Sequence, residues 1–191
     1  IIRKDAVIKV IPYGTITKEQ SGRGSLSAMD EIAGRVASFS DDGKGVQDEA
    51  LMRQAMIKAA GLDRVITAHC ENEAYPAKDA RSEWTEAVRD IQLTEETGAA
   101  LHICHVSSAR TLEAVREAKA RGVNVTCETA PHYIAFSEED VTDDGKFKMN
   151  PPIRSERDKA AILEAVKDGT IDMIATDHAP HSAEEKSKGF E

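Results

Sequence analysis

Short apolar runs rich in β-branched residues recur along the chain, and each has the length of a β-strand. They predict six strands: residues 6–11 (AVIKVI), 35–39 (RVASF), 64–68 (RVITA), 101–106 (LHICHV), 123–128 (VNVTCE) and 171–176 (IDMIAT).

One-sided helices are predicted between most of these strands. In four intervening segments, apolar residues recur three and four positions apart, which places them on one face of a helix. These residues are Leu51, Met52, Ala55 and Met56; Trp84, Val88, Ile91 and Leu93; Leu112, Val115 and Ala118; and Ile162, Leu163 and Val166. Gly61, Gly98, Gly122 and Gly169 follow these patterns closely, where a glycine would permit the left-handed turn that ends many helices.

The regular alternation of strand and helix predicts an α/β protein with a parallel sheet. Neighbouring parallel strands need a long crossover, and a helix supplies it. No low-complexity tract, linker or short repeat interrupts residues 1–191, so we predict one domain. The sheet is then either open and doubly wound or part of a closed barrel.

Polar residues, most of them titratable or metal-competent, lie at or just past the C-terminal ends of five of the predicted strands. They are Ser40, Asp41 and Asp42; His69, Cys70 and Glu71; His105; His132; and Asp177 and His178. A barrel enzyme assembles its active site at the C-terminal ends of its strands, whereas a nucleotide-binding open sheet would carry a glycine-rich turn, which is absent here. We therefore predict a (β/α)8 TIM-type barrel, incomplete in this chain, with about six strand–helix units.

Histidine and aspartate at the strand ends indicate a metal site. Neutral imidazole and carboxylate suit Zn²⁺, and a catalytic zinc keeps one position open for water. His69, His105 and one strand-end aspartate would satisfy that ligand count. His102 lies three residues before His105 in the same predicted strand, so we expect it to face the helices and to be structural.

Composition narrows the function classes further. There are 25 Lys and Arg residues against 34 Asp and Glu, a net charge of -9, and no basic run that would follow a phosphate backbone. Nucleic acid is therefore an unexpected partner.

The mean hydropathy is -0.44, and we see neither a membrane-spanning stretch nor a signal-peptide pattern. Cys70, Cys104 and Cys127 lack CxxC spacing, which suits reduced thiols in a cytoplasmic protein.

Five motifs together resemble dihydroorotase of the bacterial class I type, a zinc amidohydrolase of pyrimidine biosynthesis. They are FSDDG (39–43), HCEN (69–72), HICHVSS (102–108), KMNPPIR (148–154) and TDHAPH (176–181). The likeness runs from about Ile11 to the last residue, with the motifs in the family's order. KMNPPIR together with TDHAPH separates this family from the related hydantoinases and allantoinases.

The resemblance implies a role for each matching residue. Asp42 matches the aspartate that bridges two metal ions, His69 and His105 match the ligands of the second ion, and Asp177 matches a ligand of the first ion that also carries the proton. These roles suit the opening of a cyclic amide, which needs a nucleophile, a polarised carbonyl and a proton for the departing nitrogen.

The resemblance also implies a substrate site. Asn150 and His181 match substrate-holding positions, and Pro151 and Pro152 would stiffen the loop that carries Asn150. Without the family, Asn150 reads equally well as an ordinary turn residue. His178 has no assigned role, and we expect it to be structural.

Three features depart from a complete enzyme. The family begins with a His-x-His strand and an arginine that grips the substrate carboxylate, and nothing in residues 1–34 matches them. The segment between HCEN and the helix beginning near Ser82 is shorter than usual, and Asn72 replaces a frequent aspartate. Six strands are also too few for the barrel. We therefore expect the sequence to be the interior of a longer chain.

Several alternatives stay open. The chain is also compatible with a neighbouring cyclic amidohydrolase that acts on hydantoin or allantoin, and with a barrel that binds some other metabolite. A third alternative is an inactive homologue that serves as a structural partner of aspartate transcarbamoylase. We expect a homo-oligomer, a small-molecule substrate (dihydroorotate or carbamoyl aspartate), and one or two zinc ions.

Overall fold

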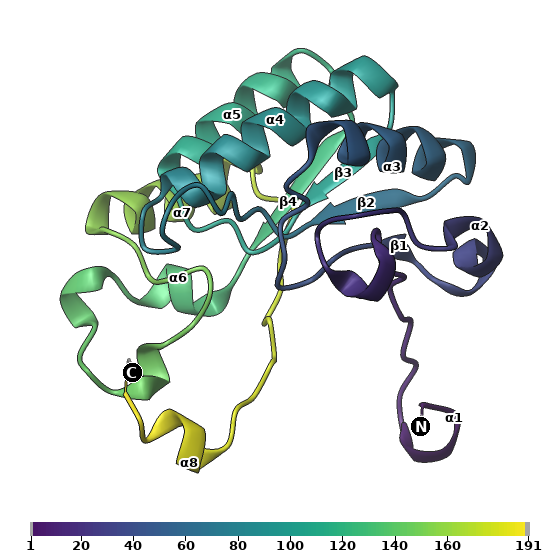
Figure 1. Cartoon of the computed structure of the whole chain (residues 1–191). Coiled ribbons are helices and arrows are strands. Elements are labelled where there is room, and N and C mark those ends of the chain that lie inside the picture. Colours follow the sequence, from purple (N-terminus) through teal and green to yellow (C-terminus); the bar gives the residue numbers. More distant parts are fainter. Residues whose placement is uncertain (1, 190–191) are drawn as a thin grey trace.

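A computed structural model describes residues 2–189 of the chain. Five parallel strands form one sheet in the order β1-β2-β3-β4-β5, so that each strand lies beside its predecessor in the sequence (Figure 1). The strands are β1 (Ser38–Phe39), β2 (Val65–Ala68), β3 (Ala100–Ile103), β4 (Val125–Thr129) and β5 (Met173–Ile174). The prediction of a parallel α/β fold is confirmed.

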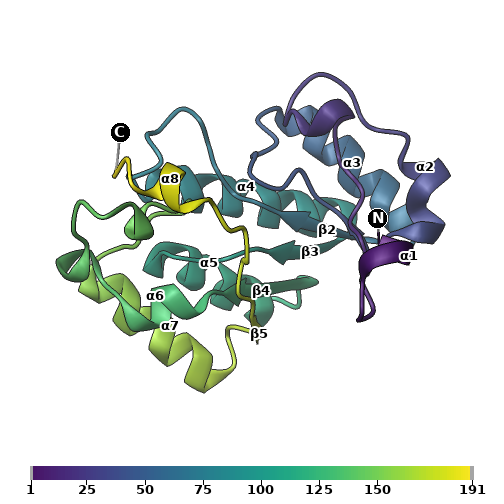
Figure 2. The same ribbon diagram turned by 90° about the horizontal axis from the view of Figure 1, so that it is seen from below.

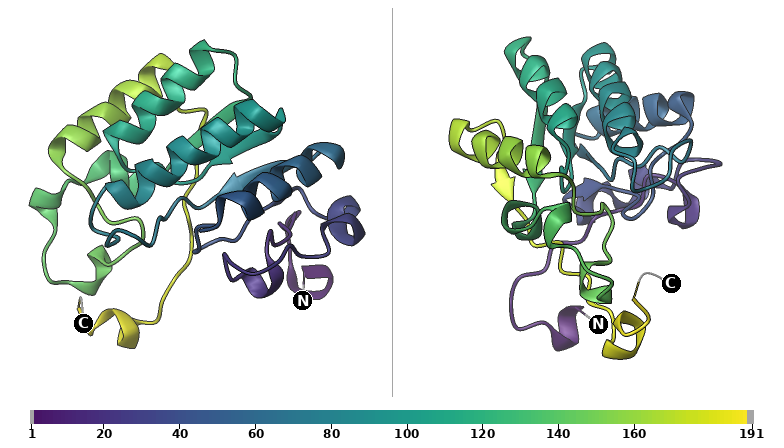
Figure 3. Two further views of the ribbon diagram at one scale, coloured as in Figure 1. Left: turned by 45° about the horizontal axis from the view of Figure 1, so that its top comes forward. Right: turned by 90° about the vertical axis from the view of Figure 1, so that its left-hand side faces the viewer.

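Four long helices cover one face of this sheet (Figures 1 and 3). They are α3 (Glu49–Gly61), α4 (Arg81–Thr97), α5 (Ala109–Ala120) and α7 (Glu156–Asp168). The shorter helices are α1 (Ile2–Asp5), α2 (Met29–Ile32), α6 (Pro131–Ala135) and α8 (Ala183–Lys186), with 3-10 turns η1 (Lys18–Gln20), η2 (Ala33–Arg35), η3 (Glu138–Asp140) and η4 (Gly145–Phe147). Within the described residues, no helix is long and apolar enough to cross a membrane.

The strand order distinguishes the two candidate architectures. In a doubly wound sheet the chain reverses direction, so the first strand lies inside the sheet and helices cover both faces. Here the order is sequential and the long helices share one face, which is the arrangement of strands and helices in a (β/α)8 barrel. The described residues contain five strands rather than the expected six.

The prediction of a strand at residues 6–11 is wrong. This segment has no strand partner and is exposed, with Val7 98% and Ile8 76% accessible to solvent. The chain first meets the sheet at an isolated parallel bridge between Gly14 and Phe39. Apolar β-branched residues favour a strand only where a neighbouring strand completes the hydrogen-bond ladder, and the described part of the chain offers none to this segment.

The core lies between the sheet and the covering helices. The side chains of Ile66 in β2 and of Leu101 and Ile103 in β3 are buried in one cluster with residues of the helices. The helix residues of that cluster include Met52, Ala55 and Met56 of α3, Ala87 and Ile91 of α4, and Leu112 and Val115 of α5. This burial fixes the helix-facing side of each strand and leaves the alternate residues on the opposite face.

Glycine ends three of the long helices as predicted. Gly98 after α4, Gly122 after α5 and Gly169 after α7 adopt left-handed backbone angles, with φ of +68°, +80° and +79°. Gly61 is different because it is the last residue of α3, and Asp63 takes the left-handed conformation instead, with φ of +53°.

The segment after β5 leaves the sheet and runs to α8, which packs against η4 (Figures 1 and 2). It carries residues 175–182 past the C-terminal ends of the strands. The loop of residues 148–154 reaches the same region, because Lys186 Nζ donates to the backbone oxygen of Lys148 at 2.6 Å.

Candidate metal and substrate site

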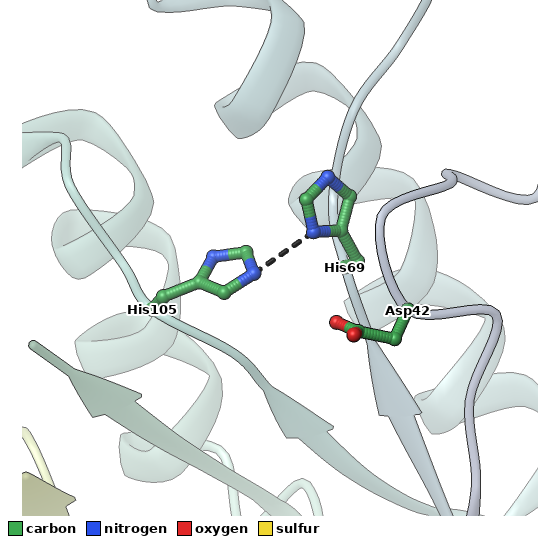
Figure 4. Close-up of side chains that lie close together, drawn as sticks. All are labelled: Asp42, His69 and His105. Atoms are coloured by element: carbon green, nitrogen blue, oxygen red, sulfur yellow. Dashed lines mark hydrogen bonds between the residues drawn. The ribbon is translucent and has the colours of Figure 1, made fainter. Parts of the chain in front are cut away.

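The loop after β1 places two adjacent aspartates in different environments. Asp41 is buried, and its carboxylate accepts hydrogen bonds from the backbone N–H groups of Ile16 at 2.8 Å and Thr17 at 3.1 Å. Asp42 follows, and its exposed carboxylate points toward two histidines (Figure 4). Asp41 thus anchors the loop, and Asp42 is left to serve the site.

Asp42, His69 and His105 form a compact group at the C-terminal ends of β1, β2 and β3 (Figure 4). One potential ligand atom from each residue lies within 4.8 Å of the others. His69 Nδ1 and His105 Nε2 share a hydrogen bond of 2.8 Å, and both rings are buried, with 4% and 5% exposure. The predicted ligands from three separate strands therefore lie together.

His105 has the electronic character that metal binding requires. Burial, followed by the proximity of His69, lowers the pKa of His105 to about 3, so its ring is neutral at physiological pH. Its buried Nδ1 has no hydrogen-bond partner among the described residues. Two imidazoles and a carboxylate are a donor set that fits a zinc-class divalent ion.

Glu71 connects this group to the loop that carries Asn150. Its Oε2 atom lies 3.1 Å from His69 Nε2 and accepts a hydrogen bond of 2.8 Å from Asn150 Nδ2. The hydrogen bond with His69, assisted by that with Asn150, lowers the pKa of Glu71 despite partial burial. A carboxylate on the outer nitrogen of a histidine is the usual support of a metal ligand. Glu71 was not among the predicted site residues, although its position two residues after His69 was a usable signal.

Asp177 lies between two cavities. It lines one of about 360 Å³ together with Asp42 and His105, and another of about 330 Å³ together with Asn150 and His181. Partial burial and the nearby Asp42 raise the pKa of Asp177, whose backbone adopts a left-handed conformation with φ of +47°. Asp177 is not part of the compact three-residue group, but it borders the same cavity.

The second cavity brings the predicted substrate residues together. Asn150 and His181 come from segments more than thirty residues apart, and both line this cavity beside Asp177. His132, which follows β4, also lines it and has a buried Nε2 atom without a hydrogen-bond partner among the described residues. The side chain of His181 is exposed, and its Nδ1 atom lies 3.8 Å from Glu185 Oε2. His178 is also exposed.

The predicted orientation of His102 is wrong. His102 pairs with Thr126 across β3 and β4, and its Nδ1 bonds the Thr126 hydroxyl at 2.8 Å. Leu101 and Ile103 pack toward the helices, so His102 lies on the opposite face of the sheet. Strand alternation does not extend to His105, because β3 ends at Ile103 and His105 adopts a left-handed conformation, with φ of +36°.

Comparison with known sequences identifies the family. A model of the dihydro-orotase-like family matches residues 1–85. A dihydroorotase of Fusobacterium nucleatum is 45% identical over an alignment that covers all of this chain and 49% of that protein. One of Brevibacillus brevis is 44% identical, covering 95% of this chain and 47% of that protein. The chain belongs to the dihydroorotase-like family. It spans about half the length of the curated relatives that it matches.

Solved structures of the same superfamily support the fold. A D-hydantoinase (dihydropyrimidinase) from Thermus sp. matches with a TM-score of 0.75 and 25% identity, over 86% of this chain and 43% of that chain. An L-hydantoinase (dihydropyrimidinase) from Arthrobacter aurescens matches with a TM-score of 0.76 and 22% identity, over 94% of this chain and 45% of that chain. The dihydroorotase-like chain therefore has the architecture of part of an amidohydrolase barrel.

Proposed function

We propose that the protein containing this chain is a zinc-dependent dihydroorotase. It would reversibly hydrolyse the cyclic amide of (S)-dihydroorotate to N-carbamoyl-L-aspartate in de novo pyrimidine biosynthesis. The observation that carries this proposal is the position of Asp177, which borders both the cavity of Asp42 and His105 and the cavity of Asn150 and His181. Similarity to dihydroorotases along the whole chain supports the choice of substrate.

One or two metal ions would be held by four residues: Asp42, His69, His105 and Asp177. Zinc, when bound, supplies Lewis acidity that polarises a carbonyl oxygen and lowers the pKa of water to about 7. The neutral state of His105 and the carboxylate of Asp42 support this assignment, because ligands must bind in their deprotonated forms.

Asp177 would carry the proton during ring opening. Its carboxylate would accept a proton from the attacking water and deliver that proton to the ring nitrogen as the C–N bond breaks. In the ring-closing direction, the same carboxylate would take the proton back from that nitrogen. Its place on the wall shared by the two cavities supports this role.

Asn150 and His181 would orient the substrate beside Asp177. The Asn150 side chain suits the amide and carbonyl groups of the ring, which both donate and accept hydrogen bonds. Lys148 and Lys186 line the same cavity, so its wall carries positive charge that favours a substrate with a carboxylate.

The first prediction is that the full natural polypeptide, loaded with zinc, opens dihydroorotate. Ultraviolet absorbance of the substrate should fall with time, and a chelator should stop the reaction because metal removal takes away the Lewis acid. Added zinc should restore turnover in the chelated sample. Absence of turnover in a folded, zinc-loaded sample would contradict the proposal and favour an inactive structural homologue.

A related cyclic amidohydrolase is the second candidate, because the matching solved structures are hydantoinases. Side-by-side assays with dihydroorotate, hydantoin and allantoin at equal enzyme concentration separate the candidates. If hydantoin or allantoin is turned over faster than dihydroorotate, that compound is the substrate instead of dihydroorotate. The motifs KMNPPIR and TDHAPH support dihydroorotate.

The second prediction concerns Glu71. Glu71→Gln should weaken metal affinity about 10–100-fold, because the amide supports the outer nitrogen of His69 less strongly than the carboxylate does. Metal affinity is measured by competition with a chromophoric chelator. Glu73→Gln is the matched control, since Glu73 lies two residues further in the same loop, is exposed, and pairs with Arg23 instead. Equal affinities in the Glu71→Gln variant and the wild type would remove Glu71 from the site.

The proposal extends to partners and location. We expect a homo-oligomer. The proposed protein partner is aspartate transcarbamoylase, the enzyme that acts one step earlier in pyrimidine biosynthesis. Cys70, Cys104 and Cys127 are free thiols, which supports a cytoplasmic location.

A further inference from the structure

The loop after β1 and the loop after β2 meet at a close backbone contact. Gly45 is buried and lies three residues after Asp42, and Glu71 lies two residues after His69. A Cβ atom on Gly45 would lie 2.4 Å from the backbone oxygen of Glu71, whereas ordinary van der Waals contact begins at 3.4 Å. Only glycine therefore allows the two loops to approach each other this closely.

Hydrogen bonds from the Gln47 side chain join the two loops at this contact. Its Nε2 atom donates to the backbone oxygen of Gly45 at 2.9 Å and to that of Glu71 at 2.7 Å. Its Oε1 atom accepts a hydrogen bond of 3.0 Å from the backbone N–H of Glu73. One carboxamide thus satisfies three backbone groups from both loops, and it uses its nitrogen and its oxygen to do so.

Two side chains of α4 hold the same loops to that helix. Glu86 is buried, and its Oε2 atom accepts a hydrogen bond of 3.0 Å from the backbone N–H of Glu71. Arg89 Nη1 donates to the backbone oxygen of Val46 at 2.7 Å, and Arg89 Nη2 donates to Glu86 Oε1 at 3.0 Å. A Cβ atom on Gly45 would also lie 2.3 Å from Glu86 Oε2. Helix α4 therefore contacts both loops where they meet.

The two joined loops carry proposed metal ligands from neighbouring strands. Asp42 belongs to the first loop and His69 to the second, and both must reach one ion. We propose that Gly45, Gln47 and Glu86 form a clamp that sets the spacing between Asp42 and His69 and thereby sets metal affinity. They are positioning residues, because none of them belongs to the compact ligand group. This inference rests on the metal site of the proposed function.

Gly45→Ala tests the clamp and leaves every donor atom of the site unchanged. The added methyl group should push the loop of Asp42 away from that of His69. The zinc affinity of the full natural polypeptide, measured by competition with a chromophoric chelator, should fall about 10–100-fold, the usual effect of losing the support of a metal ligand. Gly61→Ala is the matched control, because a Cβ atom on Gly61 would meet nothing within 4 Å beyond its own helix. Gly61 ends α3 at the opposite end of the strands, so its variant should keep wild-type affinity.

Gln47→Met is a second variant, and it keeps the clamp testable if Gly45→Ala does not fold. Methionine has nearly the length of glutamine and no charge, but it cannot bond the three backbone groups that Gln47 joins. Zinc affinity should fall by at least about tenfold. Gln92→Met is the control, since Gln92 is an exposed residue of α4, and its variant should bind zinc as the wild type does.

A contact that only stabilises the fold would give a different pattern. Ile162→Val shortens a buried side chain of α7, with 1% exposure. It should lower the denaturant midpoint of the metal-free protein and leave zinc affinity unchanged. Loss of affinity in Gly45→Ala and Gln47→Met, but not in Ile162→Val, therefore assigns the effect to loop spacing rather than to stability.

The opposite results overturn the clamp. Wild-type zinc affinity in either Gly45→Ala or Gln47→Met, once that variant is shown to be folded, would do so, as would an equal loss of affinity in Ile162→Val. These results would leave zinc binding and turnover of the wild type intact, and with them the proposed reaction. A wild type that binds no zinc would instead overturn the metal assignment itself, and the clamp with it.

Discussion

Asp177→Asn should reduce dihydroorotate turnover by about 10²–10⁴-fold, the usual contribution of a positioned acid–base group. The amide side chain has nearly the same shape as the carboxylate but cannot accept the proton. Asp177 borders the cavity of Asp42 and His105 on one side and that of Asn150 and His181 on the other. The loss should therefore fall mainly on kcat, because the substrate-holding side chains stay in place.

Asp63→Asn is a closely matched control for this substitution. Asp63 and Asp177 both have left-handed backbones, with φ of +53° and +47°, and asparagine tolerates that conformation well. Asp63 lies in the turn between α3 and β2, at the end of the strand away from the site. Its variant should keep wild-type kcat. Equal kcat in Asp177→Asn and the wild type would remove Asp177 from the mechanism.

The periodicity of the sequence was sufficient to predict most of the fold. Strands at 64–68, 101–106 and 123–128 are present with shifted ends, and the four amphipathic patterns correspond to α3, α4, α5 and α7. Strand-end residues also identified the group of Asp42, His69 and His105, because parallel strands in sequential order carry their C-terminal ends to one edge.

Other features depend on contacts that periodicity does not encode. The segment 6–11 has strand composition but pairs with no strand among residues 2–189, and its side chains are exposed. His102 follows the alternation of β3, but His105 lies beyond the end of the strand, so the face of one histidine did not predict the face of the other. Glu71 becomes part of the site through a hydrogen bond from Asn150, which lies 79 residues away in the sequence. Long-range loop contacts of this kind follow from tertiary structure rather than from local pattern.

Glu83 is a second such residue, and it is central to the stability of the site. It lies in the first turn of α4 with 2% exposure. Its carboxylate accepts hydrogen bonds from the backbone N–H of Ser108 at 3.1 Å, from the hydroxyl of Thr111 at 2.6 Å, and from both the backbone N–H and the hydroxyl of Ser107. Glu83 therefore ties α4 to the loop that follows His105 and to the start of α5.

The same network reaches the loop that carries Asn150. Arg154 Nε donates to the Ser107 hydroxyl at 3.1 Å, and Arg154 also donates to the backbone oxygens of Ala77 and Lys78 at 3.1 Å and 2.9 Å. Arg154 is buried, with 8% exposure. The last residue of the KMNPPIR motif thus anchors the loop of Asn150 to the loop of His105 through a serine that Glu83 holds.

Glu83→Gln should lower the free energy of unfolding by about 2–4 kcal/mol, because charge-assisted hydrogen bonds are lost and an amide N–H₂ group faces buried donors. Denaturant unfolding of the full natural polypeptide measures this change. Metal affinity should fall with it, since the loop beside His105 loses its anchor.

Glu117→Gln is the matched control for the stability measurement. Glu117 lies on the exposed side of α5, so its variant should stay within about 0.5 kcal/mol of wild type. If Glu83→Gln were equally mild, water or another side chain would have to satisfy the four donors that converge on Glu83. The coupling between α4, the His105 loop and the Asn150 loop would then depend on Arg154 and Ser107 alone, and Arg154→Lys would become the decisive variant.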